Sequence, residues 1–345
     1  MEEKVFKFDP NNVGIVVIGR NEGERLLRCL AIAKAQCDHV VYADSASIDD
    51  SVRAARALDV SVVQLDSSAP FTAARGRRAG LERLVAEAPD CRYVQFIDGD
   101  CLLDPGWIET AVGFLSSHPD AAVVCGRRVE ARPSASFYNR IIDQEWATPI
   151  GPAAACGGDA MMRVDAVQAA GSFRADLMAG EEPELCARLR SRGWEVWRID
   201  SAMTEHDAAI TRFGQWWRRA ERGGFGYAQV WAATRAGPFP LYARQMQSAL
   251  LWSGVIPLVA LAGAVILKNG WILSLVPALY VLQVVRIAAR RSSHFRLPDR
   301  IKAATLTVTI KFAETKGIVR YWLGRGVADS TYKRVAAPAS VGASE

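Results

Sequence analysis

Residues 93–100 read YVQFIDGD, a short run of β-forming side chains that ends in two aspartates flanking one glycine. Such a run predicts a buried strand. The acidic turn marks a ligand site, because ligands of parallel α/β sheets bind at the carboxyl ends of the strands. Two neighbouring carboxylates repel each other unless a positive charge lies between them, and a hard divalent cation fits that role. Taken alone, an acidic turn is more often simply solvated, so the rest of the chain decides the role of Asp98 and Asp100.

Strand and helix patterns alternate around this run. Strands are predicted at residues 13–18, 39–43 and 60–65, and helices at residues 25–35, 49–58 and 72–86. This order predicts an α/β domain with a largely parallel sheet covered on both faces. Asn21, Glu22 and Asp44 then fall at strand ends, in the same crevice as the two aspartates. No dinucleotide or P-loop motif follows the first strand, which argues against a nicotinamide enzyme or a P-loop NTPase.

Composition limits the class of protein. The 345 residues are 50% hydrophobic and 23% charged, which is enough apolar sequence for one large domain and an appendage. The seven cysteines include no C-x-x-C pair, which excludes a disulfide scaffold or a zinc module and suits a reducing compartment. The polar opening MEEKVFKFDPNN predicts no secretory signal peptide.

Residues 209–345 are strongly basic, with 19 Lys and Arg against 5 Asp and Glu. Within them, residues 248–267 form an uncharged run of 20, residues 268–270 a turn, and residues 271–285 a second uncharged run. These lengths predict a transmembrane hairpin whose ends both face the cytoplasm, where most of the flanking Arg and Lys lie. The alternative is a buried helical hairpin of a soluble core. Nucleic acid is the weaker partner, because the basic residues bracket apolar spans.

Two further segments have the pattern of helices that lie on a membrane surface. Phe213, Trp216 and Trp217 recur at helical spacing among arginines, and residues 299–323 mix apolar and basic side chains in the same way. Ordinary amphipathic helices on a soluble core are the alternative. The expected domains are a catalytic domain (1–208), an interface helix region (209–247), the hairpin (248–289), and a basic amphipathic segment with a flexible tail (290–345).

A second carboxylate cluster, Glu181-Glu182-Pro183-Glu184, precedes a helical pattern. Pro183 suits the first helical position, so Glu182 lies at or beside the N-cap. The helix dipole favours the ionised carboxylate there, which is the form that a general base needs at pH 7. Alternatively, these acids only stabilise the start of the helix.

Taken in order, these segments resemble the family 2 glycosyltransferases of the GT-A fold over residues 12–231. The matching segments are VVIGRNEGERL (16–26), VVYADSASIDDSV (40–52), AARGRRAGLERL (73–84), FIDGDCLLDPGWI (96–108), CGGDAMMRVDAVQAAGSF (156–173), GEEPELCARLRSRGW (180–194), WRIDSAMTEH (197–206) and QWWRRA (215–220). The DGD turn is similar to the D-x-D motif of the family, and EE to its E-D motif.

The resemblance implies a role for each residue at a motif position. It implies donor binding by Asn21, Glu22, Asp44, Arg77 and Asp98, and an acceptor side that includes Gly158, Asp159, Gln215, Trp217 and Arg218. Asp100 would bind Mn²⁺ or Mg²⁺, and His206 is either a further ligand or a structural histidine. Glu182 takes the place of the catalytic base, which is Asp in the family, so Glu181 is the fallback. Arg219 replaces the Trp of cellulose-synthase-like members, which favours transfer of a single sugar.

The implied activity is inverting transfer of a hexose from a nucleotide-diphosphate sugar, with a UDP-sugar as the expected donor. The acceptor would be a hydroxyl of a lipid or lipid-linked glycan, in exopolysaccharide or glycolipid synthesis. The bacterial inner membrane is the expected location, with the catalytic domain in the cytoplasm. Two alternatives are a polyprenyl-phosphate glycosyltransferase, whose anionic acceptor needs no base, and an inactive membrane scaffold subunit.

Overall fold

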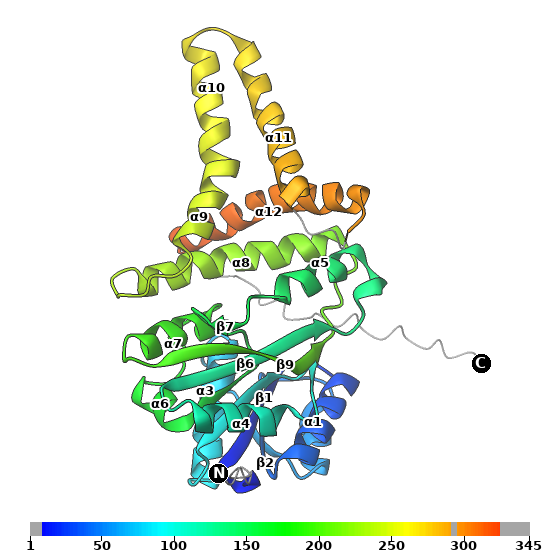
Figure 1. Ribbon diagram of the computed structural model, residues 1–345, viewed down its shortest axis with the longest axis vertical. Helices are drawn as coiled ribbons and strands as arrows, with labels where there is room; N and C mark the ends of the chain where they lie inside the picture. Colours follow the sequence, from blue (N-terminus) through cyan, green and yellow to red (C-terminus); the bar gives the residue numbers. More distant parts are fainter. Residues whose placement is uncertain (1–8, 291–294, 325–345) are drawn as a thin grey trace, which may run out of the picture.

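The computed structural model describes residues 9–290 and 295–324. Three layers follow one another along its long axis (Figure 1). An α/β domain forms the base, two long helices lie across it, and a helical hairpin rises from these helices. The predicted tail (residues 325–345) and the basic Arg291 lie outside the described residues.

The first half of the α/β domain is a parallel sheet in the order β3-β2-β1-β4. Its strands are β1 (Val13–Gly19), β2 (His39–Asp44), β3 (Ser61–Gln64) and β4 (Tyr93–Asp98). Helices α1 (Glu24–Gln36), α2 (Ser51–Ala57) and α3 (Ala73–Glu87) connect them. The elements predicted from residues 13–97 are therefore present, within two or three residues at each end. The register pairs Gly19 with Asp44 and Ile18 with Asp98, so both aspartates flank the end of β1.

The second half makes the sheet mixed. Strand β8 (Ala160–Arg163) is antiparallel to β4 and β6 (Ala121–Glu130), whereas β9 (Glu195–His206) is parallel to β6. The short β5 (Cys101–Leu103) pairs with β9 in the register Cys101–His206, and β7 (Gly151–Pro152) pairs with β9 near its start. The remaining helices of the domain are α4 (Trp107–Ser117), α5 (Phe137–Trp146), α6 (Val164–Ala169) and α7 (Glu181–Arg190). The α/β prediction is confirmed, with an antiparallel part that the strand–helix alternation did not indicate.

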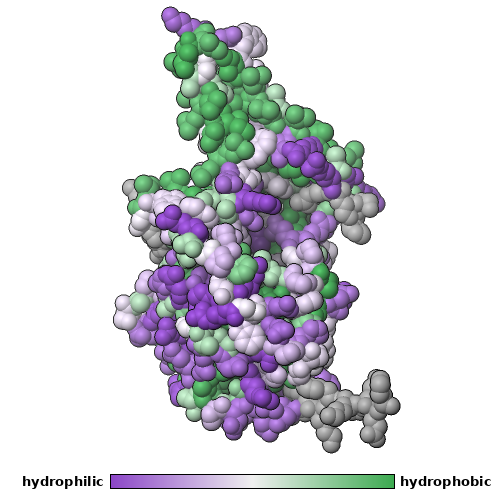
Figure 2. Space-filling model, turned by 60° about the vertical axis from the view of Figure 1, so that its left-hand side comes forward, coloured by the Kyte–Doolittle hydropathy of each residue, from purple (hydrophilic) through white to green (hydrophobic). Residues whose placement is uncertain are grey.

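The hairpin consists of two continuous helical stretches. The first is α9 (Ala243–Leu250), one π-helical turn (Leu251–Val255) and α10 (Ile256–Ile266). The second is a 3-10 turn (Gly270–Ser274) followed by α11 (Leu275–Arg290). Both stretches are long and apolar enough to cross a membrane, and only 17% and 6% of their most apolar windows are buried. The two stretches are therefore not buried in the core of this chain. Figure 2 shows them as an apolar column above a largely hydrophilic body.

Helices α8 (Phe213–Thr234) and α12 (Leu297–Trp322) form the middle layer and cross at two glycines. A Cβ on Gly224 would lie 1.9 Å from the carbonyl oxygen of Glu314, and one on Gly317 would lie 2.0 Å from that of Glu221. Only glycine permits this approach of the two backbones. Glu221 also accepts hydrogen bonds from Lys316 (2.9 Å) and Arg320 (2.6 Å).

The sequence placed the tryptophans of α8 at a membrane surface, and for Trp216 this is wrong. Trp216 is 3% exposed, in a cluster with Ile141, Ile142 and Ala303. Its face of α8 is covered by α5 and α12, so Trp216 is buried by protein. Phe213, at the start of α8, is 45% exposed, and further exposed apolar side chains lie on α12, at Leu297, Ile301, Phe312, Val319 and Trp322.

Candidate active site

The loops after β1 and β2 are tied together at the end of the parallel sheet. Asn21 donates its backbone N–H to Ser47 Oγ (2.9 Å), and its side-chain oxygen accepts from the backbone N–H of Ile48 (2.8 Å). Asp44, predicted to contact the donor, is completely buried and accepts from the Tyr42 hydroxyl (2.9 Å) and the Ser47 backbone N–H (3.0 Å). In this conformation Asp44 therefore shapes the loop from below and exposes no atom to a ligand.

Arg77, also predicted to bind the donor, lies beneath the site. The side chain is 2% exposed and comes from α3. Its Nη1 donates to Glu181 Oε1 (2.5 Å), and its Nη2 lies 2.8 Å from Asp98 Oδ1 and 3.1 Å from Glu182 Oε1. Burial alone would lower the pKa of Arg77, but these three carboxylates raise it, so the guanidinium stays charged. It joins the donor-side Asp98 to the two glutamates.

The two glutamates at the start of α7 differ in access. Burial, and then the neighbouring Glu182 carboxylate, raise the pKa of Glu181 to about 7. The Glu181 side chain is 5% exposed, against 12% for Glu182. Glu182 is thus the more accessible carboxylate, whereas Glu181 is the buried partner of Arg77.

Gly158 and Asp159 occupy the space between these groups. A Cβ on Gly158 would lie 2.5 Å from Arg77 Nη2 and 3.2 Å from Glu182 Oε1, so glycine is required for the guanidinium to reach the carboxylates. Asp159, predicted on the acceptor side, has a fully buried side chain. It accepts from the Asp98 backbone N–H (3.1 Å) and the Thr204 hydroxyl (2.8 Å), and it pairs with Arg128. Although burial opposes it, Arg128 holds the pKa of Asp159 below its usual range. Asp159 therefore supports β4 and does not reach an acceptor here.

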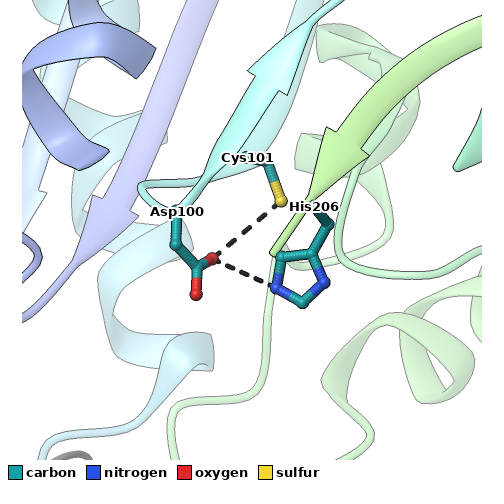
Figure 3. Close-up of side chains that lie close together, drawn as sticks. All are labelled: Asp100, Cys101 and His206. Atoms are coloured by element: carbon teal, nitrogen blue, oxygen red, sulfur yellow. Dashed lines mark hydrogen bonds and ion pairs between the residues drawn. The ribbon is translucent and has the colours of Figure 1, made fainter. Parts of the chain in front are cut away.

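Asp100 and His206 come together because β5 pairs with the end of β9. His206 Nε2 lies 3.3 Å from Asp100 Oδ1 (Figure 3). With Cys101 they form a group whose potential ligand atoms lie within 4.8 Å of one another. Burial raises the pKa of the Cys101 thiol, and sulfur is a soft ligand that a hard cation such as Mg²⁺ does not prefer. A carboxylate and an imidazole remain, which suit Mn²⁺ or Mg²⁺ when donor phosphates complete the coordination.

The two aspartates of the DGD turn belong to different groups of side chains. Asp98 is held by Arg77 and lies with Cys101 and Asp159, whereas Asp100 lies with His206. The acidic turn alone suggested a cation between Asp98 and Asp100, whereas the resemblance implied a metal on Asp100 and the donor at Asp98. In the structure the Arg77 guanidinium lies 2.8 Å from Asp98.

The remaining predicted site residues lie on or beside the middle layer and the first loop. Gln215 caps α8, since its side-chain oxygen accepts from the backbone N–H groups of Thr211 (2.9 Å) and Arg212 (3.0 Å). Trp217 is half-buried with its ring 5.9 Å from that of Phe213, and Arg218 is exposed. Glu22 pairs with Arg25 (2.9 Å) at the start of α1.

The sequence did not predict the residues that contact Asp159 on the buried side of the site, above all Arg128 and Thr204. Both lie on strands, β6 and β9, and point at Asp159. The signal for Arg128 was a charged pair directly after an apolar run in CGRRVEAR, and both arginines lie within β6, which continues to Glu130.

The comparisons with known proteins agree with this architecture. Residues 14–168 match the family described as Glycosyl transferase family 2, and residues 93–287 match Glycosyl transferase family group 2. No curated protein matches the chain. The second family match spans more than half of the sequence. The fold and site therefore define a glycosyltransferase, and the chain belongs to family 2 of these enzymes.

Three solved structures are similar to this chain to different degrees. The mannosyltransferase PcManGT from Pyrobaculum calidifontis, solved with GDP-Man and Mn²⁺, is 19% identical with a TM-score of 0.56, over 93% of this chain and 91% of that one. TarS 1–349 from S. aureus is 12% identical with a TM-score of 0.46, over 91% and 92%. Glucosyl-3-phosphoglycerate synthase from Mycobacterium tuberculosis is 14% identical with a TM-score of 0.47, over 64% and 79%. The first of these shows that this chain shares its fold with a GT-A glycosyltransferase.

Proposed function

We propose that this glycosyltransferase transfers one hexose from a nucleotide-diphosphate sugar to a hydroxyl of a lipid or lipid-linked glycan, with inversion at the anomeric carbon. The observation that carries the proposal is the Arg77 network. It holds Glu182, the accessible carboxylate, in one cluster with Asp98. Asp98 is in turn two residues from Asp100, the candidate metal ligand.

Glu182 is the proposed general base. As the acceptor hydroxyl oxygen attacks the anomeric carbon, Glu182 takes the hydroxyl proton, and the bond from that carbon to the donor diphosphate breaks. Arg77 orients the carboxylate through their 3.1 Å contact. Glu181 fits the role less well, because it is directed into the protein at Arg77.

Asp100 and His206 would hold the divalent cation, either Mn²⁺ or Mg²⁺. When bound there, such an ion supplies positive charge against the diphosphate leaving group, which carries most of the charge that develops. Asp100 contributes the anionic oxygen ligand and His206 the imidazole nitrogen. The pairing of β5 with β9 fixes their separation without a metal.

The C-terminal layers support a membrane-bound acceptor. The exposed apolar hairpin fits a bilayer span. Most Arg and Lys flank its open end, which supports a catalytic domain on the cytoplasmic side. The apolar stripe of α12 fits the head-group region. Helix α8 then lies one layer further from the lipid, as a spacer above the catalytic domain.

A non-processive reaction is supported by Arg219. It donates to Glu145 (2.9 Å) and lies over the ring of Trp216, so this position of the QWWRRA segment holds an ion pair where a stacking platform would be needed. A UDP-sugar is the first donor to test. A GDP-sugar is the second, because the PcManGT structure contains GDP-Man.

A donor panel tests the function. The purified full-length protein, in detergent with Mn²⁺, is incubated with each nucleotide sugar, and released nucleoside diphosphate is measured with and without lipid acceptors. We expect one donor to be turned over and the sugar to appear on a lipid hydroxyl. Absence of turnover with every donor would support the scaffold alternative. Full activity of Glu182→Gln with a polyprenyl phosphate would support that acceptor instead.

A further inference from the structure

A polar pocket of about 270 Å³ opens beside Asp100. Its walls come from α1, β5, the end of β9 and the loop after β6. Six charged side chains line it: Arg25, Arg28, Asp100, Arg132, Glu205 and Asp207. Asn21, Asp44, Arg77 and Glu182 do not line it. The pocket thus shares Asp100 with the proposed metal site but is separate from the base and from the loops after β1 and β2.

The three arginines differ in how far their charge is already used. Arg132 pairs with Asp207. Arg25 lies 2.9 Å from Glu22, and its Nη1 lies 3.8 Å from Asp100 Oδ2. Arg28 is exposed and has no ion pair or hydrogen bond within residues 9–290 and 295–324. It therefore has a full set of guanidinium donors to offer to a ligand.

The balance of charge in this pocket depends on Asp100. Three guanidinium groups face three carboxylates, so the six side chains together carry no net charge. A divalent cation on Asp100 and His206 would add two positive charges and compete with Arg25 for the Asp100 carboxylate. The pocket would then be positive, with Arg28 unpaired among the described residues and Arg25 held only by Glu22, so that both can bind an anion.

We propose that this pocket binds a phosphate or diphosphate group through Arg25 and Arg28 once the metal site is loaded. Guanidinium groups match phosphate oxygens in geometry and bind them with charge-assisted hydrogen bonds. The inference rests on the proposed function, which supplies two sources of such a group: the diphosphate of the donor and the phosphate of a lipid-linked acceptor.

A path of contacts links the pocket to the middle layer. The loop that carries Arg132 continues into α5, and α5 packs against the start of α12. Phe137 lies 6.1 Å from Phe295 between ring centroids, and Arg140 pairs with Asp299 (3.4 Å). One wall of the pocket is therefore directly connected to the helix that bears the exposed apolar stripe.

Inorganic pyrophosphate is the probe. Its binding to the full-length protein in detergent is measured by calorimetry, with and without Mn²⁺, for the wild type, Arg28→Gln, Arg25→Gln and a control. The control is Arg56→Gln, an exposed arginine on α2 outside the pocket. We expect the wild type to bind pyrophosphate only with Mn²⁺. Its affinity should be about tenfold lower in Arg28→Gln, the loss expected for one charge-assisted hydrogen bond. The affinity should be unchanged in Arg56→Gln. Wild-type affinity in both pocket variants would overturn the proposal.

Kinetics then distinguish the two sources. If the donor diphosphate occupies the pocket, Arg28→Gln raises the KM for donor with every acceptor. If an acceptor phosphate occupies it, the variant raises the KM only for phosphate-bearing acceptors and leaves a neutral lipid acceptor unaffected. Arg28-dependent pyrophosphate binding without any sugar transfer would remove the proposed function and leave the pocket. Sugar transfer together with pyrophosphate binding that does not depend on Arg28 would overturn the pocket proposal and leave the proposed function in place.

Discussion

Arg77 Nη2 lies 3.1 Å from Oε1 of Glu182, so the proposed base and a buried guanidinium form one ion pair. The same nitrogen lies 2.8 Å from Asp98 Oδ1. A fixed cation at this point sets the direction of the proposed base. It also connects Glu182 with Asp98 through one side chain.

Arg77→Lys should lower kcat/KM by about 10²-fold, the effect of a misplacement of about 1 Å. Lysine keeps the charge, but one ammonium group cannot reach three carboxylates in the geometry of a guanidinium. Steady-state kinetics with the donor found in the panel measures the effect, and circular dichroism checks the fold. The matched control is Arg78→Lys, at the next residue of α3, where the arginine is 48% exposed and pairs only with Glu82 among the described residues. Equal losses in both variants would contradict a special role for Arg77.

Glu182→Gln should depress transfer by about 10²–10⁴-fold and leave donor affinity unchanged, because it removes only the proton acceptor. Glu181→Gln should have the smaller effect, because Glu181 is buried against Arg77. Single-turnover transfer and equilibrium donor binding separate the two quantities. If Glu181→Gln proves the inactive variant, the assignment of the base moves by one residue.

The raised pKa of Glu181 predicts a pH-dependent contribution to stability. The folded protein holds this proton up to a pKa of about 7, above the usual value of 4.5. The contribution is therefore fully present below pH 4.5 and is lost as the pH rises through 7. We expect the thermal midpoint of the wild type to fall relative to that of Glu181→Gln between pH 5.5 and pH 8, as measured by scanning fluorimetry at both ends of that range. A constant difference between the two proteins would show that Glu181 does not titrate there.

Local patterns in the sequence predicted much of the architecture. Buried strands and amphipathic helices have characteristic periods, so the elements of residues 13–97 were predicted within a few residues. The proximity of Asp100 and His206 was also predictable in part. Both are at motif positions, and residues at the ends of neighbouring strands lie at the same edge of the sheet. The 20-residue uncharged run predicted the first arm of the hairpin on length alone.

Long-range contacts account for what the sequence did not predict. The stripe of α8 predicted Trp216 at a membrane surface, whereas α5 and α12 cover it, and α12 begins about 80 residues later in the chain. Arg77 was assigned to the donor on a motif position. Only the fold shows that α3 brings it beneath Glu181, which is 104 positions away. Asp159 was assigned to the acceptor side in the same way, whereas the fold buries its side chain against Arg128.

Asp100→Asn should abolish Mn²⁺-dependent nucleotide binding and donor turnover, because it replaces an anionic oxygen ligand with a neutral amide of the same shape. His206→Gln should weaken both more mildly, since donor phosphates and Asp100 remain. Binding of the nucleoside diphosphate is titrated with and without Mn²⁺. Asp120→Asn, an exposed aspartate in the turn before β6, is the control. Unchanged Mn²⁺ dependence in Asp100→Asn would remove the metal site from this position.

The hairpin predicts a definite topology. Residues 267–269 connect two antiparallel spans, so Asn269 should lie outside the membrane and Lys302, on the exposed side of α12, in the cytoplasm. All seven native cysteines are buried, so a single introduced cysteine can be labelled over a low background. In intact cells, Asn269→Cys should react with a membrane-impermeant maleimide. Lys302→Cys should react only after the cells are permeabilised. Labelling of Lys302→Cys in intact cells would mean that the open end of the hairpin is outside, which is incompatible with a catalytic domain that uses cytoplasmic nucleotide sugars.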